Sequence, residues 1–427
     1  MRTQENLDSG VSPSKSGYTI PEELQPVWTW KDGYSATEIK RFRQIYNPTA
    51  AATADDAGNY SSSRFSEIRN TAVVHRIGQV SILDSEPIAE IRDVTSTTIL
   101  GTMTLEEMIN DPRSRMKAIA VIHDGKVAFE KYIGIKDWDN HLGASATKIL
   151  SGTLMYMAEE IGLVDLNNPV TIYLPELEDT DWESVKIEDV LHHHSGIDIS
   201  ESRLDSSIDH PVTLLYEIAA GDPSLPPGTS LMEAVKVCKR RLEPGTRYEY
   251  ASINTYVVTL ILESVYDMPV EDLITKSIWS KSGMEGDGLL GVSPSGEPLL
   301  FGAFAARLRD LARFGMLFTP SWKVTANEQV VSDEYFDKVQ EAAKPEVYGK
   351  DYMSERLIHD FDESGFGASY QWDAVFKDGD MYKSGRFGQC LYVSPDTNTV
   401  IVYYSSAYQA EVWVHAYARE IVKKIFR

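Results

Sequence analysis

Ser145-Ala146-Thr147-Lys148 is the stretch around which the rest of this chain is organised, because it places a hydroxyl and an amine three residues apart. On an α-helix, residues i and i+3 lie on the same face, so the Lys148 ammonium can reach the Ser145 hydroxyl. A serine is a good nucleophile only beside a base, and a lysine serves as that base only when burial or positive charge lowers its pKa. Apolar residues then recur at helical spacing, at Leu150, Leu154, Met157, Ala158 and Ile161. The stretch therefore predicts a buried helix with Ser145 at its exposed start.

Two pairs of apolar segments on either side of this helix predict a sheet. Residues 118–132 contain two short apolar runs around Asp124-Gly125, a dipeptide typical of tight hairpins. Residues 389–405 contain a second pair of runs around Pro395-Asp396, and a closing helix follows. Residues 150–320 have mainly helical periodicity. Strands near both ends with helices between them predict an α/β (α+β) fold: an antiparallel sheet flanked by helices, built from both termini, with an inserted, mostly helical lobe.

The length of 427 residues exceeds what one hydrophobic core usually supports, so we expect more than one structural unit. Residues 1–62 are predicted to form an extended, partly ordered arm that docks through Trp28 and Trp30. An α/β lobe is expected from residues 63–160 and 300–427, and the helical lobe from residues 161–299. The cleft between the two lobes is the expected place for a small ligand.

The composition restricts the partners and the compartment. With 64 acidic and 41 basic residues the net charge is -23, which argues against nucleic acid and anionic membranes as partners. The acidity favours solubility over a surface that attracts cations. Cys238 and Cys390 have no metal-binding or redox spacing, and reduced thiols fit a cytoplasmic protein. We also expect no export signal and no membrane helix, because the start lacks an apolar segment and no run approaches about 18 apolar residues.

Two further motifs carry groups that suit the same chemistry. Tyr250-Ala251-Ser252 follows a turn and precedes an apolar run, and a tyrosine there could relay a proton. Lys383-Ser384-Gly385 precedes a strand pair, where a glycine permits close approach of substrate and a backbone N–H can face an oxyanion. Each motif alone is unspecific, since S-x-x-K also occurs at Ser12 and K-S-G also at Lys15 and Lys281. Their order along the chain is more informative than any one of them.

S-x-x-K, then Y-x-S, then K-S-G resembles the plan of the penicillin-recognising serine hydrolases. The segments 162–176, 191–196 and 309–315 resemble those of β-lactamase-related (class C type) esterases and amidases, known as family VIII esterases. Within that family the likeness is greatest to the nylon-oligomer (6-aminohexanoate-dimer) hydrolases, through Arg64-Phe65-Ser66 and through residues 385–389, which resemble their G-x-x-G-Q. The likeness runs from about residue 64 to the C-terminus and implies a β-lactamase/transpeptidase-like fold.

The resemblance also implies the roles of the site residues. Ser145 would be the nucleophile, Lys148 and Tyr250 the base and proton relay, and the backbone N–H groups of Ser145 and Arg386 the oxyanion hole. Ser252, Lys383, Ser384 and Gly385 would contact the substrate. No cofactor and no metal are expected.

Two departures from the family pattern concern specificity. Ser252 stands where lactamases usually carry asparagine, which points away from β-lactams as substrates. His192-His193-His194 is more histidine-rich than the family turn, but consecutive residues point in different directions and no acidic partner is spaced to complete a metal site.

The sequence therefore predicts a serine hydrolase that acts through an acyl-enzyme on a linear amide or a carboxylic ester. An acyltransferase using the same intermediate is the alternative among enzymes, and a catalytically silent binding protein is the alternative outside them. The expected partner is a small-molecule substrate, and the oligomeric state, including a homodimer, stays open. Acidic residues between 198 and 222 outnumber Arg203, so they form either a solvated face or a site for a cationic substrate group; they are Asp198, Glu201, Asp205, Asp209, Glu217 and Asp222.

Overall fold

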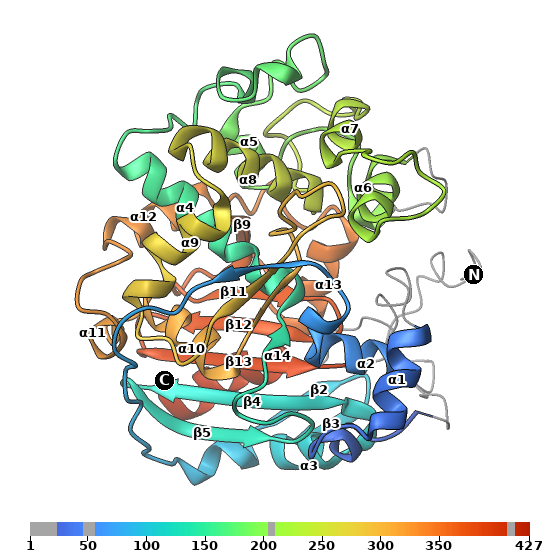
Figure 1. The fold of residues 1–427 in the computed structure, drawn as a ribbon. Helices are drawn as coiled ribbons and strands as arrows, with labels where there is room; N and C mark the ends of the chain where they lie inside the picture. The colour runs from blue at the N-terminus through green and yellow to red at the C-terminus, as the bar shows by residue number, and fades with distance from the viewer. Residues whose placement is uncertain (1–23, 46–55, 204–209, 408–414) are drawn as a thin grey trace.

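The computed structural model describes residues 24–45, 56–203, 210–407 and 415–427. A seven-stranded antiparallel sheet forms the lower half of the molecule in Figure 1 and joins segments that are far apart in the chain. Its strands in spatial order are β5 (Lys126–Tyr132), β4 (Met116–His123), β13 (Thr399–Ser405), β12 (Gln389–Ser394), β11 (Met381–Gly385), β10 (Trp372–Val375) and β9 (Gly367–Ser369). The predicted fold class, with its antiparallel sheet built from both ends of the chain, is confirmed.

The two hairpins predicted from the sequence form at the expected places. In the turn between β4 and β5, Asp124 has a φ of 48° and Gly125 a φ of 74°. Positive φ at both central residues belongs to the type I′ turn, whose twist matches that of the flanking strands. The second hairpin joins β12 to β13, and β13 then pairs with β4. The two predicted hairpins are therefore neighbours in one sheet.

Both faces of this sheet are covered, which explains why its central strands are continuously apolar. On β13, Val400 and Val402 belong to the core beneath α10 (Leu308–Met316). Ile401 and Tyr403 alternate with them and belong to the core beneath α14 (His415–Ile421). Because successive side chains of a strand point to opposite faces, a strand buried on both faces must be apolar throughout.

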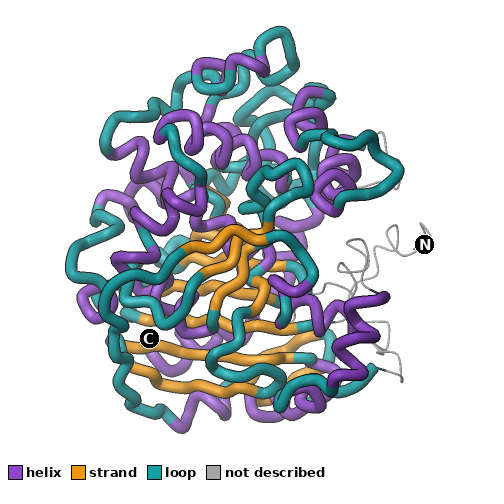
Figure 2. Tube along the Cα trace, in the orientation of Figure 1, coloured by secondary structure: helices purple, strands orange, loops and turns teal. Residues whose placement is uncertain are grey.

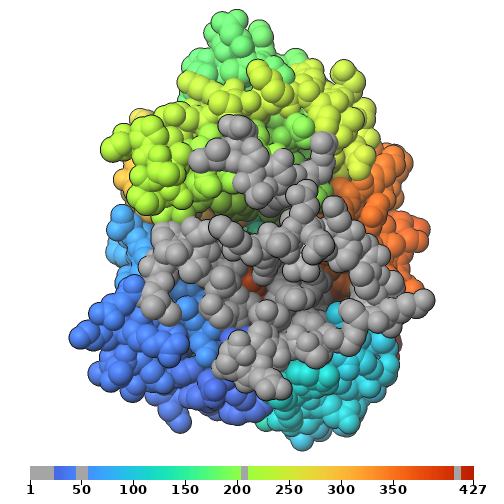
Figure 3. Space-filling view, turned by 90° about the vertical axis from the view of Figure 1, so that its right-hand side faces the viewer, coloured from blue at the N-terminus to red at the C-terminus, as the bar shows by residue number. Residues whose placement is uncertain are grey.

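A helical part lies above the sheet, as the purple segments of Figure 2 show. Its helices are α4 (Ile149–Glu160), α5 (Ile187–Leu191), α6 (Pro211–Ala220), α7 (Leu231–Lys236), α8 (Ser252–Tyr266) and α9 (Val270–Ser277). In Figure 3 this part, in green and yellow, sits above the blue and cyan segments, with the orange C-terminal segments at one side. Of the apolar stripe predicted after Lys148, Leu150, Leu154 and Ala158 are buried on α4 and Met157 is half-buried. Ile161 follows the last helical residue and is 64% exposed.

The remaining elements connect and border these two parts. A four-stranded sheet has the order β1 (Thr71–Val74), β7 (Gly288–Gly291), β8 (Phe304–Ala306) and β6 (His141–Leu142). In the described chain, a two-stranded sheet and four helices lie outside the two larger sheets and the helical part. They are β2 (Thr95–Thr98), β3 (Gly101–Thr104), α3 (Leu105–Asn110), α11 (Trp322–Thr325), α12 (Glu334–Ala342) and α13 (Tyr352–Phe361). No helix in the ranges described is long and apolar enough to cross a membrane.

The N-terminal segment differs from its prediction in two ways. Where it is described, it is helical rather than extended, with α1 (Ala36–Ile45) and α2 (Asp56–Ser63). Trp30 stacks on Tyr34 with ring centroids 4.9 Å apart, but Trp28 is 42% exposed, so the prediction that both indoles dock is wrong. Both tryptophans lie in a 3₁₀ turn, Val27–Trp30, where residues i and i+3 share a face. Val27 and Trp30 therefore face the protein together, and Trp28 does not.

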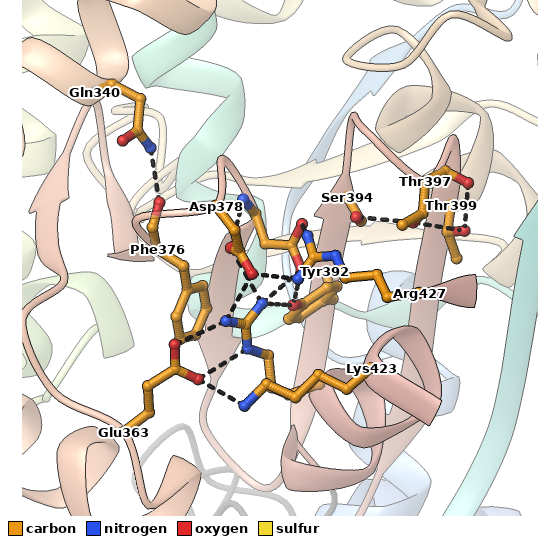
Figure 4. Close-up of polar contacts among 12 residues, drawn as sticks. Gln340, Glu363, Phe376, Asp378, Tyr392, Ser394, Thr397, Thr399, Lys423 and Arg427 are labelled. Atoms are coloured by element: carbon orange, nitrogen blue, oxygen red, sulfur yellow. Dashed lines mark hydrogen bonds and ion pairs between the residues drawn. The ribbon is translucent and has the colours of Figure 1, made fainter. Parts of the chain in front are cut away.

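A buried ionic cluster fixes the C-terminal helix under the sheet. Figure 4 shows Glu363, Asp378, Tyr392, Lys423 and Arg427 converging from different segments. At its centre, Arg419 on α14 donates to Asp380 Oδ2 at 2.7 Å, to the Tyr392 hydroxyl at 3.0 Å and to Glu363 Oε1 at 2.8 Å. Asp380 directly precedes β11, so this cluster also fixes one end of the strand that carries Lys383.

Candidate active site

Ser145 and Lys148 meet as the sequence predicted, but on a different helix type. Residues Ala144–Lys148 form a 3₁₀ helix, and the α-helix α4 begins only at Ile149. With three residues per turn, positions i and i+3 are eclipsed, so the 3₁₀ turn stacks the two side chains directly. The distance from Lys148 Nζ to Ser145 Oγ is 3.1 Å. Ser145 is half-buried, whereas Lys148 has no exposed surface.

The surroundings of Lys148 lower its pKa. Burial is the largest cause and brings the pKa from its ordinary value of 10.5 to about 7; Glu201 acts against this shift, and the positive charge of Lys383 adds to it. Besides Ser145, Nζ contacts the Ser252 hydroxyl at 2.9 Å and the Phe301 carbonyl oxygen. A large fraction of Lys148 is therefore a neutral amine at neutral pH, which is the form that can accept a proton.

Tyr250 lies beside this pair and is buried. Its ring centroid is 5.4 Å from Lys148 Nζ and 4.6 Å from Lys383 Nζ. Burial raises the pKa of the Tyr250 hydroxyl well above its ordinary value, with Asp373 and Glu201 adding to the effect, although a hydrogen bond to Ser145 opposes it. The phenol consequently keeps its proton at neutral pH, so it is suited to donate a proton and Lys148 to accept one.

Lys383, Ser384 and Gly385 lie on β11, next to the turn that holds Ser145. A Cβ atom on Gly385 would lie 2.6 Å from the Gly143 carbonyl oxygen and 3.0 Å from the Ala146 nitrogen. Real Cβ atoms do not approach backbone atoms so closely, so only glycine lets the strand end at this distance from the turn. Arg386 follows with an exposed side chain. The backbone segments proposed for the oxyanion hole are therefore neighbours.

A buried carboxylate that the sequence analysis missed holds this strand. Asp373 on β10 forms an ion pair with Lys383, and neither side chain has exposed surface. Its Oδ2 also accepts from the Ser384 backbone N–H at 2.9 Å and from the Ser384 hydroxyl at 2.5 Å. The sequence did contain a sign of such a contact, because an aspartate within the apolar run 370–376 must have a polar partner when the strand is buried.

Ser252 connects Lys148 to two groups that were not assigned to the site from the sequence. Its hydroxyl lies 3.0 Å from the hydroxyl of Tyr216 on α6, and its backbone N–H donates to Glu201 Oε1 at 2.7 Å. Ser252 is the first residue of α8, so Glu201 places a negative charge at the N-terminus of that helix, where the helix dipole favours it.

Among the acidic residues between 198 and 222 that the structure describes, Glu201 is the one placed near Lys148. Asp198 pairs with Arg241 at 3.2 Å. Burial raises the pKa of Glu217, and Asp222 accepts from the Ser224 backbone N–H. Asp205 and Asp209 lie outside the described residues.

The three consecutive histidines are buried and support the site. His192 Nδ1 accepts from the Tyr370 backbone N–H at 3.0 Å, close to the strand that carries Asp373. The His193 ring lies 5.1 Å from the Tyr250 ring, and burial lowers the pKa of each of the three imidazoles. Over the ranges the structure describes, no group of three or more His, Cys, Asp or Glu side chains is arranged to hold a metal ion. Cys238 and Cys390 are buried free thiols.

This fold and this arrangement of groups match a known class. The chain belongs to the β-lactamase family, whose model matches residues 113–421, and it is a hydrolase of that family related to amidases and esterases. It is 26% identical over 349 residues to the 6-aminohexanoate-dimer hydrolase of Paenarthrobacter ureafaciens, which covers 81% of this chain and 85% of that protein.

Two solved structures share the fold. One is a Bacillus anthracis protein assigned as a 6-aminohexanoate-dimer hydrolase, 19% identical, with a TM-score of 0.73 over 87% of this chain and 94% of that one. The other is EstCE1, described as a hydrolase with promiscuous acyltransferase activity, 14% identical, with a TM-score of 0.54 over 75% of this chain and 96% of that one.

Proposed function

We propose that the protein is a serine hydrolase that cleaves a linear amide or a carboxylic ester through an acyl-enzyme on Ser145. The observation that carries this proposal is the buried Lys148 amine, 3.1 Å from the Ser145 hydroxyl and with its pKa lowered to about 7. A neutral amine has two N–H groups and one lone pair. When the N–H groups face the Phe301 carbonyl oxygen and the Ser252 hydroxyl, the lone pair is available to Ser145.

In the proposed reaction, Ser145 Oγ bonds to the substrate carbonyl carbon while its proton passes to Lys148. The backbone N–H groups of Ser145 and Arg386 stabilise the resulting oxyanion. When the bond to the leaving nitrogen or oxygen breaks, Tyr250 donates the proton that this atom needs and recovers one from Lys148. Water then attacks the acyl-enzyme by the same route, which releases the acid and restores Ser145.

We further propose that the preferred substrate carries a free amine. The similarity to a 6-aminohexanoate-dimer hydrolase and the position of Glu201 beside Ser252 support this preference. Passing the acyl group to an added amine or alcohol would make the protein an acyltransferase, and product analysis with an added nucleophile distinguishes the two activities.

A serine-directed phosphonate tests the nucleophile. Intact-mass spectrometry should find one adduct on the wild-type protein and none on Ser145→Ala, with the label mapped to Ser145 by peptide analysis. Ser280→Ala, which replaces a half-buried serine far along the chain, is the matched control and should be labelled like the wild type. A label on any other serine would refute the assignment of Ser145, and a protein that no acyl donor or phosphonate modifies would be a silent binding protein.

A further inference from the structure

The edge of β11 beside Ser145 contains the donors of an anion site, and this site is already filled. The Lys383 ammonium, the Ser384 backbone N–H and the Ser384 hydroxyl all point to one carboxylate, that of Asp373. A cation and two further donors around one point form a strong site for a carboxylate. Because Asp373 comes from the neighbouring strand β10, the ligand of this site is part of the protein itself.

Asp373 satisfies this anion site in both charge and hydrogen bonds. Lys383 and Asp373 have no exposed surface, and Ser384 is buried, so these donors do not face solvent. The Ser384 hydroxyl has a single proton, and that proton is given to Asp373. The strand therefore presents no positive charge and no hydroxyl proton to a substrate anion, and Glu201 adds a negative charge on the Lys148 side.

We propose that Asp373 determines specificity: by occupying the donors of Lys383 and Ser384, it makes the site accept acyl donors that are uncharged next to the scissile bond and exclude those that carry a carboxylate there. This inference rests on the proposed function, since it concerns the substrate of the same reaction. It names a substrate class, namely amides and esters whose leaving group has no adjacent anion. It also assigns a role to a buried aspartate that none of the three motifs contains.

A matched pair of substrates measures the exclusion directly. 6-Aminohexanoyl-glycine and 6-aminohexanoyl-glycinamide share the acyl part and the scissile amide, and differ only in a carboxylate one carbon from the leaving nitrogen. Wild-type protein should hydrolyse the glycinamide with at least a tenfold higher kcat/KM. Equal values for the two substrates would overturn the proposal.

The variant Asp373→Ala empties the site and leaves a cavity of the size of a carboxylate. The preference for the glycinamide should then fall at least tenfold, because the glycine carboxylate can approach Lys383 and Ser384. Added formate should fill the cavity, restore the wild-type preference in a saturable manner and compete with the glycine substrate. Asp373→Asn keeps the volume and is the control for the cavity, so formate should have no effect on it. Its preference for the glycinamide should still fall, because an amide does not neutralise the charge of Lys383. An unchanged preference in Asp373→Ala, or an equal response of both variants to formate, would also overturn the proposal.

Two readouts separate this inference from the proposed function and from loss of the fold. Phosphonate labelling of Ser145 without discrimination between the two amides would refute the role of Asp373 and leave the hydrolase proposal intact. Absence of labelling in the wild type would refute the hydrolase proposal instead. If the thermal melt shows that Asp373→Ala is unfolded, the wild-type ratio and the Asp373→Asn ratio decide: a wild-type preference that Asp373→Asn leaves unchanged would count against the proposal.

Discussion

Replacing Lys148 by methionine should abolish turnover and make the fold less dependent on pH. Methionine is similar in length and has no charge, so it removes the base without leaving a large cavity. Lys148 is fully buried, and its pKa falls from 10.5 to about 7 on folding, chiefly through burial. Between these two values the unfolded amine carries a proton that the folded amine has lost.

The sign and size of the effect follow from this difference. Where the unfolded state binds more protons, the free energy of unfolding rises with pH, by at most about 1.4 kcal/mol per pH unit for one group. The wild type should therefore gain about 2 kcal/mol between pH 7 and pH 9 relative to Lys148→Met. The difference should stop changing below about pH 7, where both the folded and the unfolded amine are protonated.

Denaturant unfolding of both proteins at several values from pH 6 to pH 9 measures this difference, and all other titrating groups cancel. Hydrolysis of a chromogenic short-chain ester over the same range should rise through a single ionisation near pH 7 and then level off. Lys148→Arg is the second variant and should also be inactive, because guanidinium stays protonated. Parallel stability curves, or more than a tenth of wild-type turnover in either variant, would refute the role of Lys148.

Three further predictions concern the proton donor, the substrate and the C-terminal cluster. Tyr250→Phe should lower kcat for an amide about 10²- to 10⁴-fold and for a p-nitrophenyl ester much less, because only the amide leaving group needs a proton; equal losses would contradict this role. Substrates with a free amine should have a kcat/KM about tenfold to a hundredfold higher than their N-acetylated forms, and Glu201→Gln should reduce that preference. Nitrocefin should be hydrolysed slowly if at all. Equal kcat/KM values for the free and the acetylated amine would leave Glu201 with the role of a helix cap only. Arg419→Met should lower the free energy of unfolding by about 1.5–3 kcal/mol, since it removes the charged hydrogen bond to Asp380 Oδ2 while Arg427 still pairs with Oδ1. Lys423→Met at the exposed edge of the cluster should cost less than about 1 kcal/mol; similar costs in urea unfolding would contradict the central place of Arg419.

The parts of the fold that could be predicted are those fixed by local chemistry. The turn at Asp124-Gly125 needs residues that adopt positive φ, and the continuous apolar run before it, in β4, is typical of a strand buried on both faces. The helix type at Ala144–Lys148 could not be predicted in this way, since a spacing of three residues fits both an α-helix and a 3₁₀ helix. The prediction for Trp28 was wrong because the sequence does not distinguish an exposed tryptophan from a docked one. The 3₁₀ turn Val27–Trp30 decides which of the two indoles faces the protein.

In the candidate site, too, the residues that could be predicted are those whose local sequence is distinctive. Ser145, Lys148, Tyr250 and Ser252 could be found because each lies in a short motif. Asp373, Tyr216 and Phe301 could not be placed, because each reaches the site through a tertiary contact from a segment without a motif. Nothing in the local sequence of residues 370–376 states that Asp373 faces Lys383, since that contact depends on the register of β10 against β11.

The two carboxylates near Lys148, Asp373 and Glu201, share a physical role that bears on the protonation state of this lysine. A buried lysine stays neutral only if the groups around it neither solvate nor neutralise its proton, so each nearby charge must have another partner. Asp373 is taken by Lys383 and Ser384, and Glu201 by the N-terminus of α8. The two carboxylates therefore hold β11 and α8 in place near Lys148, while their hydrogen bonds go to these elements and not to the Lys148 amine. Burial is the largest cause of the lowered pKa of Lys148, and both carboxylates act against it, so losing either pairing should alter the pH at which the amine becomes a base.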